Sequence, residues 1–274
     1  MKKYLIVSGD SFTKGDRMGD KGSWAYHTAK KMGLELINLS ENGMCNEWIS
    51  NTLLLHLYSN PDILKDSVVM VGWTDFAREI IYYNAVYENM GRDEISYTVT
   101  TPVDVHTDYD GGHSSYILDT KIKKYPKIVT PFFGHDMMNL HTTYMSILHT
   151  KTFLENNDIP YIFFDAVSDN KIYFRHPNEF YLRTYDGGKY VLDFEKVKQL
   201  DFFTNYTKKP IVDYIFDSNY ISFDNQSIFG WLHNHATIGD LSYEEGNAGH
   251  TNEKGADYIS NIIINEYEKI YNQR

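Results

Sequence analysis

The first 75 residues alternate short apolar runs with segments of helical periodicity, and this alternation is the feature that most constrains the fold. Two continuous apolar runs, residues 4–7 and 68–71, are each followed within two residues by a glycine. Such runs are typical of strands buried on both faces of a parallel sheet. Between them lie a helical segment at 23–32, a strand candidate at 35–39 and a second helical segment at 46–58. This order predicts a parallel sheet with right-handed crossovers.

The rest of the chain continues this pattern but interrupts it twice. Residues 136–156 have helical spacing, 159–164 form a fourth buried strand, and 255–271 end the chain as an amphipathic helix. The stretches between these elements are irregular and aromatic, and long loops of this kind commonly act as lids or binding walls. We therefore expect one domain over residues 1–274, with insertions at about 84–130 and 166–235.

Composition and charge limit the class of protein. The formal net charge is −11, and without clustered Lys and Arg we expect no nucleic-acid partner. No stretch approaches the ~18 apolar residues of a membrane span, and the start lacks the ~7-residue apolar core of a signal peptide. Cys45, the single cysteine, cannot form an internal disulfide, and we expect a buried, inert thiol. We expect a soluble protein, cytoplasmic or otherwise without a cleaved signal peptide, although a virion or leaderless export fits equally.

Four loops bring chemically capable groups to the ends of predicted elements. A Gly-Asp-Ser tripeptide ending at Ser11 follows the first strand, Gly43 precedes a helix, Thr74 follows the third strand, and His250 precedes the last helix. Ligands of open parallel sheets bind outside the carboxyl ends of the strands. Taken alone, Ser11 is more typical of a turn with a helix-capping serine than of a nucleophile. The four loops together indicate a serine nucleophile, backbone N–H donors and an imidazole base at one rim.

These four blocks resemble the SGNH hydrolases, also called GDSL esterases and lipases, over the whole chain. The resemblance implies a flavodoxin-like three-layer α/β/α fold, hydrolysis of esters or O-acyl groups, and no cofactor or metal. It implies that Ser11 is the nucleophile and that His250 is its general base. It also implies an oxyanion hole made by the N–H groups of Ser11 and Gly43, with Thr74 as a third donor.

The chain departs from the family pattern at three positions. Thr74 stands where the family has asparagine, Asn247 stands where it has the aspartate that orients the histidine, and Thr251 replaces a proline. An asparagine carbonyl can hold the imidazole tautomer but cannot stabilise the imidazolium electrostatically. Three alternatives follow: a Ser–His dyad with other support, a triad completed by another carboxylate, or an inactive carbohydrate- or protein-binding module. The candidate carboxylates are Asp240, Glu244 and Glu245.

Three further side chains are candidates for substrate contact. Trp73, at the end of the third strand, can wall the crevice or pack in the core. His233 and His235 alternate as neighbours on a strand do and can contact substrate beside His250, although zinc would need a further ligand. We interpret the His and Asp cluster at 106–113 as a turn. The expected substrate is a small-molecule or carbohydrate acyl ester, for example an O-acetyl sugar, with acyl transfer to an alcohol as the alternative reaction.

Overall fold

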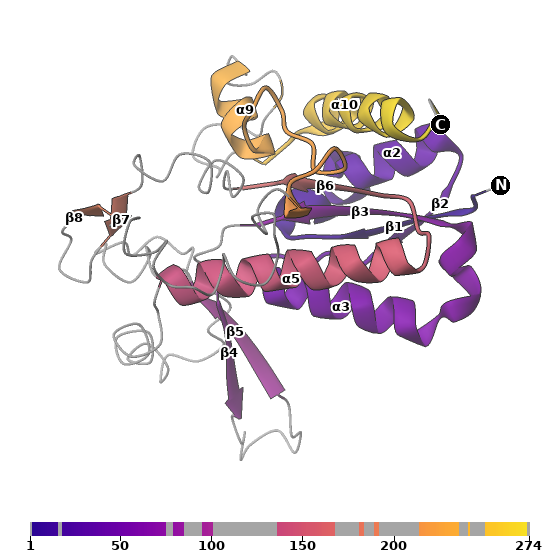
Figure 1. The fold of residues 1–274 in the computed structure, drawn as a ribbon. Helices are drawn as coiled ribbons and strands as arrows, with labels where there is room; N and C mark the ends of the chain where they lie inside the picture. The colour runs from indigo at the N-terminus through magenta and orange to yellow at the C-terminus, as the bar shows by residue number, and fades with distance from the viewer. Residues whose placement is uncertain are drawn as a thin grey trace, which may run out of the picture.

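The computed structural model describes residues 2–15, 18–74, 79–84, 95–100, 136–167, 181–183, 189–191, 214–235, 241 and 250–272. The centre of the fold is a four-stranded parallel sheet in the order β2-β1-β3-β6 (Figure 1). The four strands are β1 (Tyr4–Ser8), β2 (Glu35–Asn38), β3 (Ser67–Trp73) and β6 (Tyr161–Asp165). Each matches one predicted apolar or strand segment, so the predicted α/β fold with a parallel sheet is confirmed.

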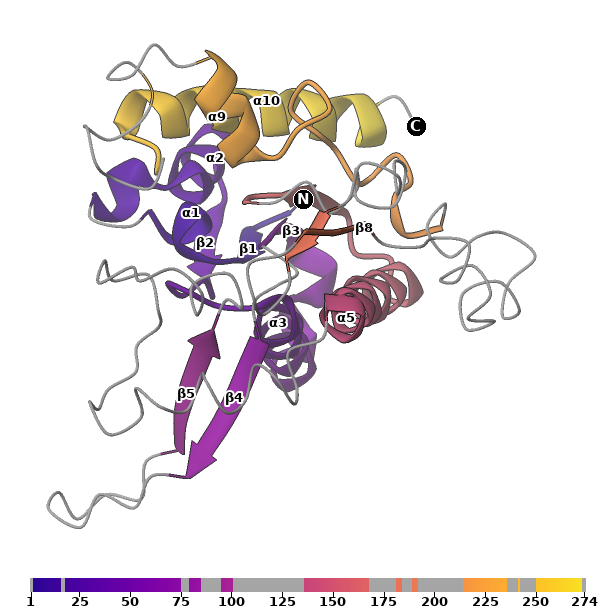
Figure 2. The same ribbon diagram turned by 90° about the vertical axis from the view of Figure 1, so that its left-hand side faces the viewer.

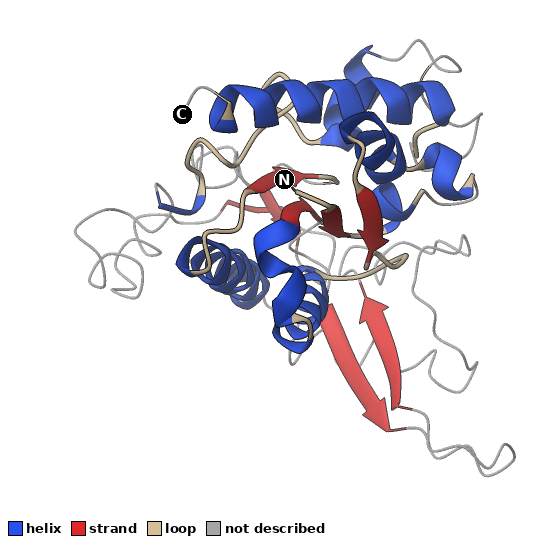
Figure 3. Cartoon of the chain, turned by 90° about the vertical axis from the view of Figure 1, so that its right-hand side faces the viewer, coloured by secondary structure: helices blue, strands red, loops and turns tan. Residues whose placement is uncertain are grey.

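Helices cover both faces of this sheet and make three layers (Figures 2 and 3). On one face lie α2 (Trp24–Met32) and α10 (Glu253–Tyr271), which pack against each other. On the other face lie α3 (Asn46–Ser59) and α5 (Asp136–Asn156). The helices follow the strands along the chain, as a parallel sheet requires for its crossovers.

The core is divided in two by the sheet, because successive residues of a strand point to opposite faces. Leu5 and Val7 of β1 belong to the apolar cluster that includes Trp24 of α2. Ile6, between them, belongs to the cluster that includes Ile49 of α3. All five side chains are completely buried. The continuous apolar run of β1 thus serves both layers at once.

Helix α10 begins two residues before the position that the sequence predicts. The side chain of Asn252 accepts a hydrogen bond from the Gly255 N–H over 2.9 Å, so the first turn is capped ahead of the glycine. The other predicted helices agree with the structure to within one residue at either end. Among the described helices, none has the length and apolar character needed to cross a membrane.

The first predicted insertion contains some regular structure. Strand β5 (Ile95–Thr100) pairs antiparallel with β4 (Glu79–Asn84), which begins just before the predicted insertion. In the second insertion, β7 (Tyr181–Arg183) and β8 (Lys189–Val191) form another antiparallel pair. Residues 85–94 and 101–135 lie outside the described part of the chain.

The last part of the second predicted insertion belongs to the core, which corrects that prediction. The Phe163 N–H of β6 donates to the Asn219 carbonyl over 2.9 Å, and the Ile221 N–H donates to the Phe163 carbonyl over 2.8 Å. Residues 219–221 therefore lie along the open edge of β6 and extend the sheet by one short parallel bridge. Helix α9 (Ile228–His235) follows and buries Trp231 against the α2 and α10 side.

Candidate active site

Ser11 lies just beyond the carboxyl end of β1, at the start of the short helix α1 (Ser11–Lys14). Asp10 caps this helix, and its Oδ1 accepts a hydrogen bond from the Phe12 N–H over 3.0 Å. The cap fixes the single turn on which Ser11 stands, and only 8% of Ser11 is exposed. The hydroxyl is therefore held at the rim of the sheet where parallel-sheet proteins bind ligands.

His250 meets Ser11 although the two residues are 239 positions apart in the sequence. The distance between His250 Nε2 and Ser11 Oγ is 2.7 Å, within the reach of about 2.6–3.2 Å expected of a nucleophile and its base. The next residue anchors this segment, because the Thr251 hydroxyl donates to the Gly22 carbonyl over 2.8 Å. The structure thus brings together the two side chains that the sequence predicts as partners.

Phe12, which sequence reasoning missed, stacks against the imidazole of His250. The two ring centroids are 4.5 Å apart and the ring planes are inclined by 23°. Phe12 is 5% exposed, and its other ring neighbour is Phe229, which meets it edge-to-face. In the sequence, Phe12 could have been identified by its position directly after Ser11, which puts both side chains on the same helical turn.

Thr74 does not hold the role that the family resemblance implies. Its hydroxyl donates to Asp10 Oδ2 over 2.7 Å, and its N–H donates to Asn46 Oδ1 over 2.8 Å. A threonine hydroxyl carries one hydrogen, so none is left for an oxyanion. The prediction of Thr74 as an oxyanion donor is therefore wrong. Thr74 instead joins the end of β3 to the cap of α1 and to the start of α3.

Gly43 lies in the turn that leads into α3, with a φ of +74° that favours glycine. A Cβ built at this position would meet no atom within 4 Å, so the turn is open on that side. The turn belongs to the loop after β2, and this loop is bonded to the serine loop because the Glu41 N–H donates to the Gly9 carbonyl over 3.2 Å. The role of the Gly43 N–H as an oxyanion donor stays a prediction.

Two glycines at neighbouring strand ends make room for the side chain of Thr13 in α1. A Cβ at Gly9 would lie 2.2 Å from Thr13 Oγ1, and a Cβ at Gly72 would lie 2.7 Å from the same atom. Any side chain at either position would push α1 away from the sheet. The glycine of the Gly-Asp-Ser tripeptide therefore has a packing reason, which is the close approach of α1 to β1 and β3.

The structure does not support the predictions made for Trp73 and for the two histidines as substrate contacts. Trp73 is completely buried and meets Phe163 edge-to-face in the core, which corrects the prediction that it contacts substrate. His233 and His235 lie in α9 and not in a strand. Positions two apart on a helix do not share a face, so the strand-like alternation predicted for this pair is also wrong.

Several predicted residues lie outside the described part of the chain. They are the His and Asp cluster at 106–113, the alternative carboxylates Asp240, Glu244 and Glu245, and Asn247. Within the described residues, no group of three or more His, Cys, Asp or Glu side chains could hold a metal ion.

Cys45 is 1% exposed, and burial raises the pKa of its thiol to about 12.

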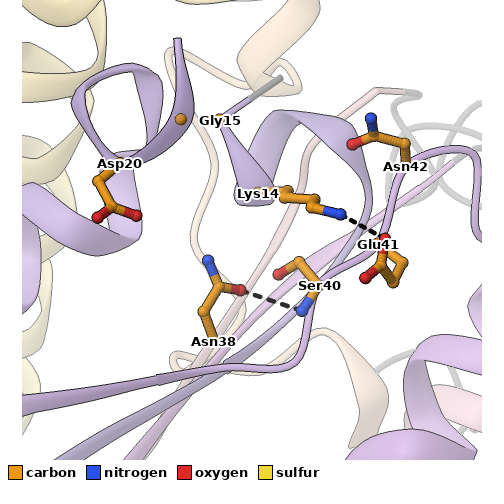
Figure 4. A pocket seen from close by; sticks show the side chains of 8 residues that line it. Lys14, Gly15, Asp20, Asn38, Ser40, Glu41 and Asn42 are labelled. Carbon is orange, nitrogen blue, oxygen red and sulfur yellow. Dashed lines mark hydrogen bonds and ion pairs between the residues drawn. The ribbon is translucent and has the colours of Figure 1, made fainter. Parts of the chain in front are cut away.

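A polar cavity of about 370 Å³ lies beside α1 (Figure 4). Lys14 of α1 forms an ion pair with Glu41 over 2.5 Å across one wall, and Asn38 Oδ1 accepts from the Ser40 N–H over 3.0 Å on another. Its lining residues are glycines or carry charged, amide or hydroxyl groups; they are Lys14, Gly15, Gly19, Asp20, Asn38, Ser40, Glu41 and Asn42. The polar groups among these residues can exchange hydrogen bonds with the hydroxyl groups of a ligand.

No protein-family model and no curated protein matches the chain. Solved structures similar to it include an esterase, EstA, from Pseudoalteromonas sp., with 8% identity, 100% of both chains covered and a TM-score of 0.46. An acetyl xylan esterase, AlAXEase, has 12% identity, covers 96% of this chain and 98% of its own, and has a TM-score of 0.42. A GDSL-like lipase from Bacteroides thetaiotaomicron has 12% identity, covers 98% and 89%, and has a TM-score of 0.41. All three TM-scores are below 0.5, so the chemistry proposed below depends on the contacts of the chain itself.

Proposed function

We propose that the protein is a serine ester hydrolase in which Ser11 is the nucleophile and His250 is the general base. The observation that carries this proposal is the 2.7 Å contact between His250 Nε2 and Ser11 Oγ. A serine hydroxyl is a weak nucleophile at neutral pH and needs a base within hydrogen-bond reach. Both groups lie at the carboxyl rim of the sheet, next to the Asp10 cap that holds the serine turn in place.

The reaction proceeds in two steps. Ser11 Oγ attacks the acyl carbonyl carbon while His250 Nε2 accepts the hydroxyl proton, and the resulting oxyanion receives hydrogen bonds from the Ser11 and Gly43 N–H groups. Collapse of this intermediate expels the alcohol, which takes the proton from the imidazolium and leaves acyl-Ser11. A water molecule that is deprotonated by His250 then releases the acid and restores Ser11. Asn247 is proposed to accept from the imidazole and hold its tautomer.

The proposed substrates are small acyl esters of hydroxyl-rich alcohols, such as O-acetyl groups on carbohydrate. The polar cavity beside α1 supports this choice, because its wall groups can exchange hydrogen bonds with sugar hydroxyls. Ser11 and His250 do not line the cavity, but Lys14 on its wall lies one helical turn along α1 from Ser11.

The test combines a serine-directed fluorophosphonate probe with hydrolysis of p-nitrophenyl acetate. We expect the folded protein to be labelled, Ser11→Ala to abolish labelling, and His250→Ala to lower turnover by at least ~10³-fold. Ser218→Ala is the matched control, because among the described residues the exposed Ser218 hydroxyl makes a single long hydrogen bond, 3.4 Å to its neighbour Asn219. Folded wild-type protein that is neither labelled nor active on several acetyl esters would contradict the proposal and favour a binding module.

A further inference from the structure

We propose that Phe12 is a positioning residue that holds the His250 imidazole with Nε2 directed at Ser11. This inference rests on the proposed function. Its basis is the stacked pair, with ring centroids 4.5 Å apart and planes inclined by 23°. Aromatic pairs in this geometry contribute beyond the area they bury and favour one ring orientation over others. Nε2 is 2.7 Å from Ser11 Oγ. A rotation of the imidazole about its Cβ–Cγ bond would break the stack and lose this contact.

Phe12 can act as a support because it is itself fixed. Its N–H is bound to the Asp10 side chain, and its ring is 5% exposed. Phe229 meets the ring edge-to-face, with centroids 6.0 Å apart and planes inclined by 89°. The Phe229 N–H donates to the Ala166 carbonyl over 3.0 Å, which ties this second ring to the end of β6. Although 38% of Phe229 is exposed, this backbone anchor fixes the ring that contacts Phe12 from the side.

One short helix supplies both the Ser11 and the Phe12 contact of the imidazole. Ser11 and Phe12 are adjacent in the first turn of α1, so the hydrogen bond to Nε2 and the stacking surface move together. During attack the imidazole accepts a proton and becomes a cation. An aromatic face whose centroid is within about 6 Å of a cation attracts it. Phe12 is thus placed to favour the protonated histidine that forms with the oxyanion.

The experiment replaces the aromatic face and keeps the side-chain bulk. Phe12→Leu and Phe12→Met remove the ring, and Phe12→Tyr keeps it. With p-nitrophenyl acetate, we expect the first two variants to lower kcat roughly 3- to 10-fold with little change in KM, and Phe12→Tyr to stay near the wild-type kcat. Phe223→Leu is the matched control, because Phe223 belongs to the same apolar cluster but meets Phe164 edge-to-face. It should lower the melting temperature and leave kcat unchanged.

A second measurement does not depend on turnover. The imidazole C–H protons of His250 lie over the Phe12 ring, so their NMR resonances should be shifted upfield and should lose that shift in Phe12→Leu or Phe12→Met. Wild-type kcat in both variants, an unchanged NMR shift, or an equal loss of kcat in Phe223→Leu would overturn the inference. Failure of the proposed function is recognised separately, because wild-type protein would then show neither labelling nor hydrolysis while the NMR shift still reports the stack.

Discussion

The hydroxyl of Thr74 donates a hydrogen bond to Asp10 Oδ2 over 2.7 Å, and both side chains are completely buried. The other oxygen of the same carboxylate accepts from the Phe12 N–H. Asp10 therefore connects the end of β3 to the first turn of α1, which carries Ser11. Because its hydroxyl is bound to Asp10, Thr74 stabilises the loop that carries Ser11.

Replacing Thr74 with valine should destabilise the protein, because a buried carboxylate loses a donor while the side-chain shape is kept. Hydrogen bonds to charged groups contribute about 1.5–3 kcal/mol, and we expect a loss of this order in the free energy of unfolding from urea titration. The matched control is Thr28→Val, since the buried Thr28 hydroxyl has no hydrogen-bond partner in the described structure. Equal losses in the two variants would show that the Asp10 contact contributes nothing particular.

Gly72→Ala should be destabilising and should be rescued by a second substitution. The new Cβ would lie 2.7 Å from Thr13 Oγ1, whereas its next neighbours, at 3.3 and 3.4 Å, would need to shift by only a few tenths of an ångström. We expect a loss of about 1–3 kcal/mol that Thr13→Ala largely restores. A double-mutant cycle measures the coupling between the two sites. Additive effects would mean that Thr13 is not what excludes a side chain at position 72.

Cys45 should be unreactive in the folded protein. Burial raises the pKa of its thiol to about 12, so almost no thiolate forms near pH 8, and the thiolate is the reactive species. We expect no reaction with a chromogenic disulfide reagent in buffer and one thiol per chain in urea. Cys45→Ala should give no signal in either condition and should keep any esterase activity. Rapid modification of the native protein would contradict this picture.

Asp257 should stabilise the protein only above its own titration range. Lys31, 2.7 Å away, lowers the pKa of this carboxyl below its usual value of 3.8. Because the folded pKa is the lower one, the stabilisation is complete above the unfolded pKa and disappears as the pH falls through the folded pKa. With 46% of the Asp257 side chain exposed, Asp257→Asn should cost at most about 1 kcal/mol at pH 7.

The check for Asp257→Asn is urea unfolding of both proteins at pH 7 and at stepwise lower pH. The difference in unfolding free energy should shrink toward zero in acid, and 1 M salt should reduce it at pH 7 because exposed ion pairs are screened. His27 also contacts the Asp257 carboxylate, with its Nδ1 3.3 Å from Oδ1. A difference that grows as the pH falls would show the opposite linkage.

Local patterns in the sequence were sufficient to predict the four strands of the sheet and helices α2, α3, α5 and α10 to within two residues at either end. The continuous apolar run at 4–7 is typical of a strand buried on both faces, and the spacing at 46–58 reflects the 3.6-residue period of a helix; both signals depend only on near neighbours. They therefore indicate which side chains turn inward before any partner is known. The same holds for Ser11 and His250 as candidates, because their chemistry and their positions at element ends can be seen in the sequence.

Tertiary structure alone decided which of these groups are partners. Whether Thr74 faces an intermediate or Asp10, whether Trp73 faces solvent or Phe163, and which ring supports His250 all depend on contacts between elements far apart in the chain. The contacts of Thr74 and His250 with α1 depend on how closely this helix approaches β1 and β3, a distance that Gly9 and Gly72 permit but that no local pattern specifies. Residue types and periodicity determined the candidates at the rim of the sheet, and the packing of one short helix decided their neighbours.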